Sequence, residues 1–150
     1  MSSTVLDDID RVILSALVRN GRASYRELGE LAQLSPHAVA PRVRRLLETG
    51  VITGFTATID DESVGRGLDA LIDLRLQSTT VPEQFEAVAA ELPAVREISF
   101  LTGRFDYQLR AACLGADDLD HTVRALRKAG AAVTETRIVM RTRTFRREVA

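Results

Sequence analysis

The chain has 150 residues, of which 45% are hydrophobic and 27% charged, and its formal net charge is −1. This composition is typical of a globular protein and argues against a long disordered segment. No apolar run approaches the ~20 residues of a membrane span, and the N-terminus lacks the basic start and apolar core of a signal peptide. We therefore expect a cytoplasmic protein without a membrane partner. The single cysteine, Cys113, excludes an intramolecular disulfide and a Cys-rich zinc module.

Arginine supplies nearly all of the positive charge, since Lys128 is the only lysine among 20 basic residues. The guanidinium fork donates two hydrogen bonds at once, which suits phosphate and guanine. A genome-wide codon preference explains the same enrichment. One local cluster stands out, because Arg42, Arg44 and Arg45 lie in a stretch without acidic residues from 31 to 47.

The first fifty residues carry the signals of three short helices. Apolar residues recur at three- and four-residue steps from Leu6 to Leu17, which predicts an amphipathic helix that ends at Asn20-Gly21. Ser24 and Glu27 form a capping-box pattern before a second helix. A third helix is predicted to begin with Ser35 as N-cap and Pro36 at the first helical position. Gly50 is its expected left-handed end.

Three helices joined by tight turns, the last one carrying arginines, describe a helix-turn-helix. The inward face of the third helix contains Val39, Val43, Leu46 and Leu47, so its other side is expected to meet the major groove of DNA. The alternative is a solvated face that happens to be basic. The expected DNA-binding residues are Ser24, Ser35, His37, Ala38, Pro41, Arg42, Arg44 and Arg45.

Pro41 lies inside this predicted recognition helix. It removes the backbone hydrogen bond to the carbonyl of His37 and crowds that turn. Two interpretations stand: a kink that shapes the contact with DNA, or a proline that the helix tolerates.

A β-branched run over residues 51–59 predicts a strand that completes a winged helix-turn-helix domain, residues 1–59. The polar, glycine-containing residues 60–67 are the predicted linker. Residues 68–150 then read as strand (from Leu68), helix (81–92), strand (95–102), strand (107–114), helix (117–129) and strand (133–144). This β-α-β-β-α-β order predicts an α+β, ferredoxin-like domain with two helices on one sheet face. Its other face is expected to carry Leu71, Phe100 and Ala112 and to meet a second copy.

These elements in this order resemble the Lrp/AsnC (feast/famine) family of bacterial and archaeal transcription regulators. The resemblance covers almost the whole chain and rests on the stretches 6–14 (LDDIDRVIL), 20–24 (NGRAS), 34–35 (LS), 42–46 (RVRRL), 50–55 (GVITGF), 102–107 (TGRFDY) and 134–139 (TETRIV). It implies a DNA-binding homodimer, with octamers as a further assembly. It also implies a small effector, often an amino acid, bound between the C-terminal ligand-sensing domains.

Carried over by position, the resemblance implies that the effector-binding residues are Gly103, Arg104, Asp106, Thr134 and Thr136. A carboxylate suits the ammonium of an amino acid, and turn N–H groups and hydroxyls suit its carboxylate. Purely structural roles are the alternative, because glycine makes hairpins, aspartate caps them and threonine favours strands. Many relatives carry an acidic residue in place of Arg104, so this arginine either binds an anionic group or blocks the usual ligand.

The sequence offers no catalytic constellation, so we expect no enzyme, no catalytic residue, no metal site and no cofactor. His37 and His121 are far apart, Cys113 lies in an apolar strand, and the acids from Asp117 to Asp120 fit the start of a helix. The expected function is that of a DNA-binding regulator modulated by an effector. The rival hypothesis is a small-molecule sensor or assembly protein whose winged helix contacts protein rather than DNA.

Overall fold

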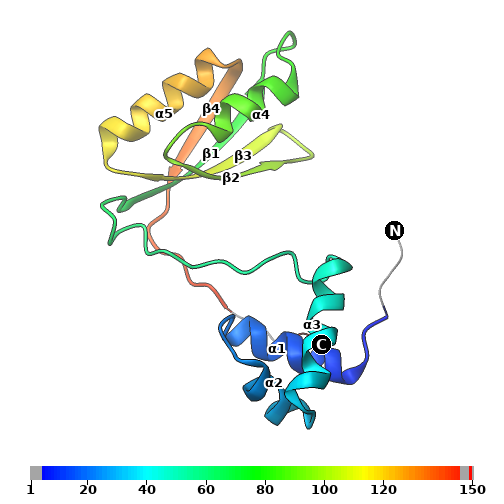
Figure 1. The fold of residues 1–150 in the computed structure, drawn as a ribbon. Helices are drawn as coiled ribbons and strands as arrows, with labels where there is room; N and C mark the ends of the chain where they lie inside the picture. Colours follow the sequence, from blue (N-terminus) through cyan, green and yellow to red (C-terminus); the bar gives the residue numbers. More distant parts are fainter. Residues whose placement is uncertain (1–4, 146–148, 150) are drawn as a thin grey trace. The chain divides into compact units, whose positions relative to one another are not determined.

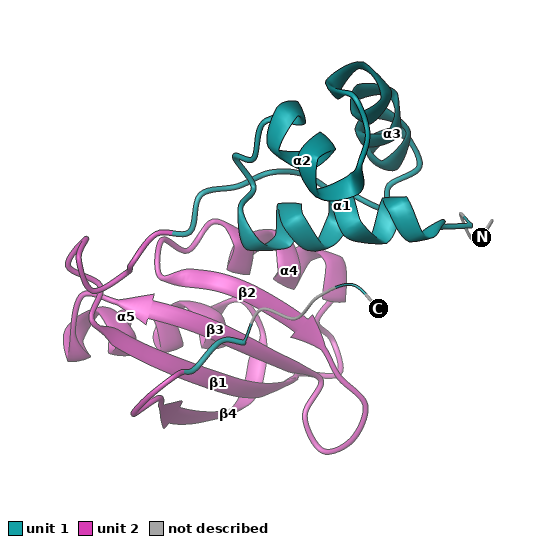
Figure 2. Ribbon diagram, turned by 90° about the horizontal axis from the view of Figure 1, so that it is seen from below, with its two compact units in different colours: residues 1–58, 143–150 teal, residues 59–142 magenta. Residues whose placement is uncertain are grey.

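The computed structural model describes residues 5–145 and Val149. The chain divides into two compact units, drawn in Figures 1 and 2. The helical unit contains residues 1–58 together with 143–150, and the sheet unit contains residues 59–142. The sequence pattern assigned the last eight residues to the second domain, whereas here the chain passes between the units twice and its end is grouped with the helices.

The helical unit contains α1 (Asp8–Arg19), α2 (Tyr25–Ala32) and α3 (Pro36–Glu48). The predicted start signals are confirmed. The Ser24 hydroxyl accepts from the Glu27 amide while Glu27 reaches back, and Ser35 caps α3 with Pro36 behind it. A further capping box, formed by Asp7 and Asp10, begins α1. Local capping chemistry therefore sets where each helix starts.

Close packing of α2 against the start of α3 requires a glycine. A Cβ at Gly29 would lie 2.5 Å from the Leu34 carbonyl oxygen, closer than real Cβ contacts allow. Gln33, in the left-handed conformation, ends α2 and turns the chain toward α3. The three helices enclose one apolar core that contains Ile13, Leu14, Ala16, Leu28, Val39, Val43 and Leu46.

The strand predicted over residues 51–59 is wrong. After the Ile52 amide, which donates to the Leu46 carbonyl, no backbone hydrogen bond joins residues 53–59 to the rest of the described chain. A strand exists only where a neighbouring strand accepts and donates its ladder bonds. The β-branched sequence is present, but the described part of the chain supplies no partner strand for it.

The sheet unit contains β1 (Leu68–Leu76), α4 (Pro82–Ala90), β2 (Val95–Phe100), β3 (Tyr107–Cys113), α5 (Ala116–Lys128) and β4 (Ala131–Ile138). All pairings are antiparallel and the order across the sheet is β2-β3-β1-β4. This is the ferredoxin-like arrangement predicted from the sequence. The last strand ends at Ile138 instead of reaching Thr144, because β1, its partner, begins at Leu68.

Both helices of this unit cover the same face of the sheet (Figures 1 and 2). Phe85 of α4 and Leu126 of α5 pack on the alternate strand residues Ile72, Leu74 and Leu109. Phe100 was expected on the opposite face, but its ring lies 5.2 Å from that of Tyr107, which also contacts Phe85. Phe100 therefore lies on the helix side, at the sheet edge.

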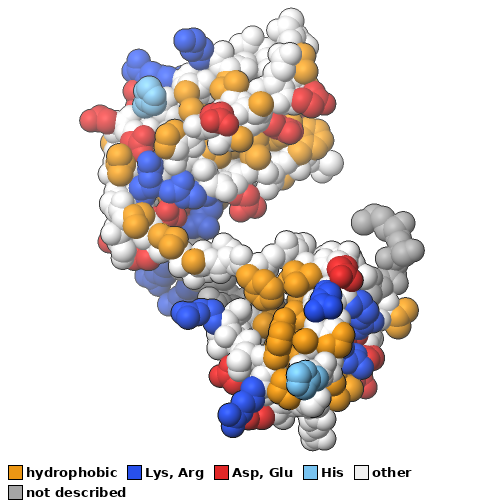
Figure 3. Space-filling model, in the orientation of Figure 1, with side chains coloured by type: hydrophobic (Ala, Val, Ile, Leu, Met, Phe, Trp, Pro, Cys, Tyr) orange, Lys and Arg blue, Asp and Glu red, His pale blue; other side chains and the backbone are white. Residues whose placement is uncertain are grey.

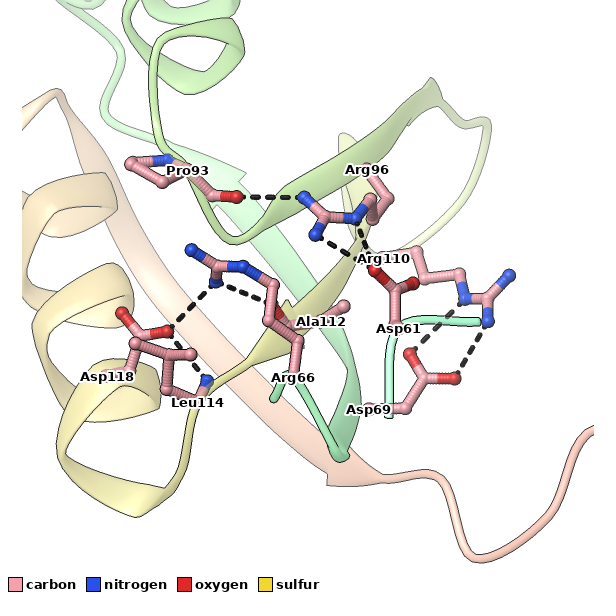
Figure 4. A network of polar contacts seen from close by, with 9 residues as sticks. All are labelled: Asp61, Arg66, Asp69, Pro93, Arg96, Arg110, Ala112, Leu114 and Asp118. Atoms are coloured by element: carbon pink, nitrogen blue, oxygen red, sulfur yellow. Dashed lines mark hydrogen bonds and ion pairs between the residues drawn. The ribbon is translucent and has the colours of Figure 1, made fainter. Parts of the chain in front are cut away.

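The segment before β1, expected as a linker, is held against the sheet unit by ion pairs (Figure 4). Arg96 binds Asp61 at 3.0 Å. Arg66 donates to the Ala112 carbonyl at 3.0 Å and to Asp118 at 3.2 Å. Residues 61–66 are thus fixed to the strand ends and are not a free connector.

Candidate nucleic-acid interface and effector site

The predicted DNA-facing side of α3 is only partly open. His37, Pro41 and Arg44 are exposed, whereas Ala38, Arg42 and Arg45 are half-buried. The visible face of this unit carries basic side chains, a histidine and apolar groups side by side (Figure 3). Arg44 makes no ion pair with any described residue, so its charge is available to a ligand.

Arg42 and Arg45 are bound to aspartates at the start of α1. Nη1 of Arg42 lies 2.6 Å from Oδ2 of Asp7 and 2.8 Å from Oδ1 of Asp10. Arg45 binds the other oxygen of Asp10. The sequence predicted that both arginines point away from the core. Their guanidinium groups in fact return to α1, so they brace α1 against α3.

The charges of this cluster stabilise one another. Burial raises the pKa of Asp10, but hydrogen bonds from Arg45, from Arg42 and from the Asp7 backbone outweigh it and leave the pKa below its ordinary value. The pKa of Asp7 is lowered by the Asp10 amide and then by Arg42. The pKa of Arg42 is raised by its bonds to Asp7 and Asp10. Asp7, Asp10 and Arg42 are therefore charged at neutral pH.

The two predicted serines are exposed but already serve as caps. Oγ of Ser24 accepts from the Glu27 amide at 3.2 Å and donates to the Glu27 carboxylate at 2.8 Å. Oγ of Ser35 accepts from the Ala38 amide at 3.2 Å. Helix α3 continues through Pro41 without interruption, since it runs from Pro36 to Glu48.

In the sheet unit, the hairpin between β2 and β3 contains three of the predicted effector residues. Gly103 has a φ of +113°, a conformation that favours glycine. The guanidinium of Arg104 lies 5.0 Å from the centre of the Phe105 ring. Oδ2 of Asp106 accepts from the Leu76 amide at 2.8 Å, which ties the hairpin to the end of β1. The second carboxylate oxygen of Asp106 has no partner among the described residues.

The other two predicted effector residues lie on β4. Thr134 is opposite Leu74 and Thr136 is opposite Ile72 in the register with β1. Oγ1 of Thr134 accepts from Nε and Nη2 of Arg127 at 3.0 and 2.7 Å. The structure thus brings Asp106 and Thr134 to the same end of β1, on its two sides.

Sequence reasoning missed three residues at these sites, Asp7, Asp10 and Arg127. The D-x-x-D capping pattern at Asp7 was readable, but its contact with α3 was not. Around the sites, the described residues hold no group of three or more His, Cys, Asp or Glu side chains that could bind a metal. Burial raises the pKa of the Cys113 thiol, which makes it a poor nucleophile.

A helix-turn-helix joined to a ferredoxin-like domain defines a class of protein, the transcription regulators that combine a DNA-binding domain with a ligand-binding domain. Residues 6–47 match the model of the AsnC-type helix-turn-helix domain, and residues 69–149 match that of the Lrp/AsnC ligand binding domain. The chain belongs to the Lrp/AsnC family of transcriptional regulators. In the part of the chain that the structure describes, no helix is both long enough and apolar enough to cross a membrane.

Individual relatives agree with this assignment. The chain is 41% identical to the HTH-type transcriptional regulator AldR of Mycolicibacterium smegmatis, over 76% of this chain and 68% of that protein. It is 32% identical to the regulator LrpA of Mycobacterium tuberculosis, over 91% of each. Among solved structures, a transcriptional regulator from Neisseria meningitidis in complex with L-Met has a TM-score of 0.89 and 29% identity, covering 97% of both chains.

Proposed function

We propose that this regulator binds specific DNA sequences through α3 and that a small effector, an amino acid held between the sheet units of two copies, modulates this binding. The expected assembly is a homodimer, with octamers as a further state. The protein works in the cytoplasm and has no catalytic step. Effector binding favours one arrangement of the copies, and that arrangement sets the spacing of the two α3 helices along the DNA.

The observation that carries the DNA-binding part of the proposal is the open row on α3. His37, Pro41 and Arg44 are exposed one turn apart on a helix of 13 residues, long enough to lie in the major groove. Arg44 brings an unpaired guanidinium to this row. Ser24 and Ser35 lie at the starts of α2 and α3, where backbone amides suit phosphate.

Binding of the chain to a genomic fragment library, followed by anisotropy titration of the selected fragment at several salt concentrations, tests this part. Arg44→Ala is expected to lower the affinity for DNA. It is also expected to reduce the slope of log K against log salt concentration by about 0.9, the value of one phosphate contact. Arg124→Ala is the control, because Arg124 is also an exposed arginine but lies in the sheet unit, where it pairs with Asp120. Selection of no fragment, or equal binding by both variants, would support the rival hypothesis of a protein-contacting module.

The effector part is supported by the charges at the end of β1. Asp106 offers a free carboxylate oxygen to an ammonium, while Arg104 and Arg127 offer guanidinium groups to a carboxylate. Gly103, Arg104 and Thr136 are exposed, as expected of a site that a second copy completes. The relative crystallised with L-Met supports an amino acid as the ligand class.

Calorimetric titration with a panel of amino acids tests the effector part. Asp106→Asn keeps an acceptor for the Leu76 amide but removes the charge, and it is expected to weaken effector binding at least tenfold. Thr134→Val removes the hydroxyl while keeping the side-chain shape and is expected to act in the same direction. Arg104→Ala separates two possibilities. Weaker effector binding would show that Arg104 contacts an anionic group of the effector, and tighter binding would show that Arg104 blocks the site. An unchanged heat of binding in Asp106→Asn would contradict the proposed site.

A further inference from the structure

Two aspartates and two arginines face one another across α1 and α3, but the two aspartates are not equivalent. Asp10 is fully buried and bridges both arginines, whereas the Asp7 side chain is 51% exposed and binds Arg42 alone. Two negative charges balance two positive ones. Arg42 and Arg45, two of the three arginines that sequence reasoning assigned to DNA, are therefore neutralised within the chain.

The carboxylate of Asp7 lies on the side of α3 that is expected to meet DNA. One open hollow of about 520 Å³ is lined by Asp7, Ala38, Pro41, Arg42 and Arg45. Four of these residues belong to the predicted DNA-facing side of α3. Any phosphate that approaches Arg42 from this side also approaches Asp7.

We propose that Asp7 is a specificity-determining residue, which restrains Arg42 from binding phosphate, while Asp10 is a positioning residue for Arg42 and Arg45. This inference rests on the proposed DNA-binding function and deepens it. Phosphate contacts raise the affinity for every sequence equally, whereas base contacts discriminate. By neutralising Arg42, Asp7 lowers the sequence-independent part of the binding, so that base contacts make up a larger share of it.

Asp7→Asn tests the role of Asp7 with little disturbance of the fold. Asparagine is as good an N-cap as aspartate, so the hydrogen bond to the Asp10 amide is retained. Asp8→Asn is the matched control: it removes the same charge from the same helix turn, and Asp8 makes no ion pair with any described residue. Anisotropy titrations use both the fragment selected from the genome and a mixed-sequence duplex, across a range of salt concentrations.

Loss of the Asp7 charge leaves Arg42 paired with Asp10 alone. This loss is expected to raise the affinity of Asp7→Asn for mixed-sequence DNA by roughly five- to tenfold near 0.1 M salt, and to steepen the salt slope by at most about 0.9. The affinity for the selected fragment rises less, so the ratio between the two falls. Asp8→Asn is expected to change both affinities less than about twofold. The double variant Asp7→Asn/Arg42→Ala is expected to lose the gain, since the gain acts through Arg42.

Equal effects of Asp7→Asn and Asp8→Asn, or a gain that persists without Arg42, would overturn the inference. Circular dichroism checks that each variant is folded, and Asp7→Ser, another good N-cap, replaces Asp7→Asn if that variant unfolds. The salt slope separates this role from a merely structural one, because a loss of packing does not steepen it. If the unaltered chain binds no DNA at any salt concentration, the proposed function fails; if it binds DNA and the two variants agree, only this inference fails.

Discussion

The helical unit and the sheet unit both pair arginines with aspartates, but the pairs do different work. In the sheet unit, Arg66 and Arg96 fasten the segment before β1 to the strand ends, away from the predicted effector residues. In the helical unit, Arg42 and Arg45 are paired on the face that is expected to meet DNA. The comparison shows that the number of arginines in a sequence cluster does not give the number of unpaired positive charges. Asp7, which binds Arg42, lies 35 residues earlier in the chain.

The comparison requires that each unit has a hydrophobic core of its own. Substitution of Phe85 tests this for the sheet unit. Phe85 is fully buried between α4 and the sheet. Phe85→Ala is expected to destabilise the sheet unit by about 3–4 kcal/mol. Segment-resolved hydrogen exchange is expected to show the loss of protection in β1 and β3 while α1–α3 keep theirs. Val88→Ala on the exposed side of α4 is the control, with a cost of about 0.5 kcal/mol.

The next largest effect is expected at Asp10, the buried member of the helical cluster. Asp10→Ala leaves Arg42 and Arg45 without their shared partner and removes the Asp10 half of the capping box. The expected loss is about 2–3 kcal/mol, below that of a fully buried pair because the arginine side chains are 28% and 42% exposed and can be hydrated. Urea unfolding followed by circular dichroism measures it. A loss no larger than the ~0.5 kcal/mol expected for Asp8→Ala would show that the cluster does not brace α1 against α3.

Local signals were readable from the sequence, and long-range ones were not. Ser24 with Glu27, and Ser35 with Pro36, fix helix starts within four residues, so the pattern predicted them correctly. The alternation that begins at Leu68 similarly predicted β1 and the order of the sheet domain. By contrast, residues 51–59 have strand propensity but no neighbouring strand in the described chain. Propensity alone does not form a strand without the backbone hydrogen bonds to such a neighbour.

The candidate sites follow the same division. The exposure of His37 and Arg44 could be predicted from the sequence. The helical period places them on the side of α3 opposite its buried apolar residues. The pairing of Arg42 with Asp10 depends on how α1 crosses α3, which the sequence period does not give. The contact of Arg127 with Thr134 likewise depends on how α5 returns to β4, so Arg127 carried no recognisable signal.

The aspartate–arginine cluster of the helical unit also predicts that this unit loses stability in acid. The pKa of Asp10 is lowered in the folded chain, so its contribution to stability is fully present above the ordinary aspartate pKa of about 4 and is lost as the pH falls through the folded value. The pKa values of Asp7 and Glu27 are shifted in the same direction. In Asp10→Asn the decline of the urea midpoint of the helical unit below about pH 4 is expected to be shallower. Parallel declines in both proteins would contradict a role for the Asp10 charge.

The smallest effect is expected at Arg66, which tests whether the ion pairs of the sheet unit fasten the chain. The Arg66 side chain is 19% exposed and holds both Asp118 and the Ala112 carbonyl. Arg66→Ala is expected to cost about 1 kcal/mol and to speed hydrogen exchange over residues 61–67. Arg124→Ala is the control, because its helix pair with Asp120 is 77% and 62% exposed and is worth at most about 0.5 kcal/mol. Equal exchange rates in the two variants would mean that backbone turns, and not Arg66, hold residues 61–67. The ion pairs of the sheet unit would then not fasten the segment before β1.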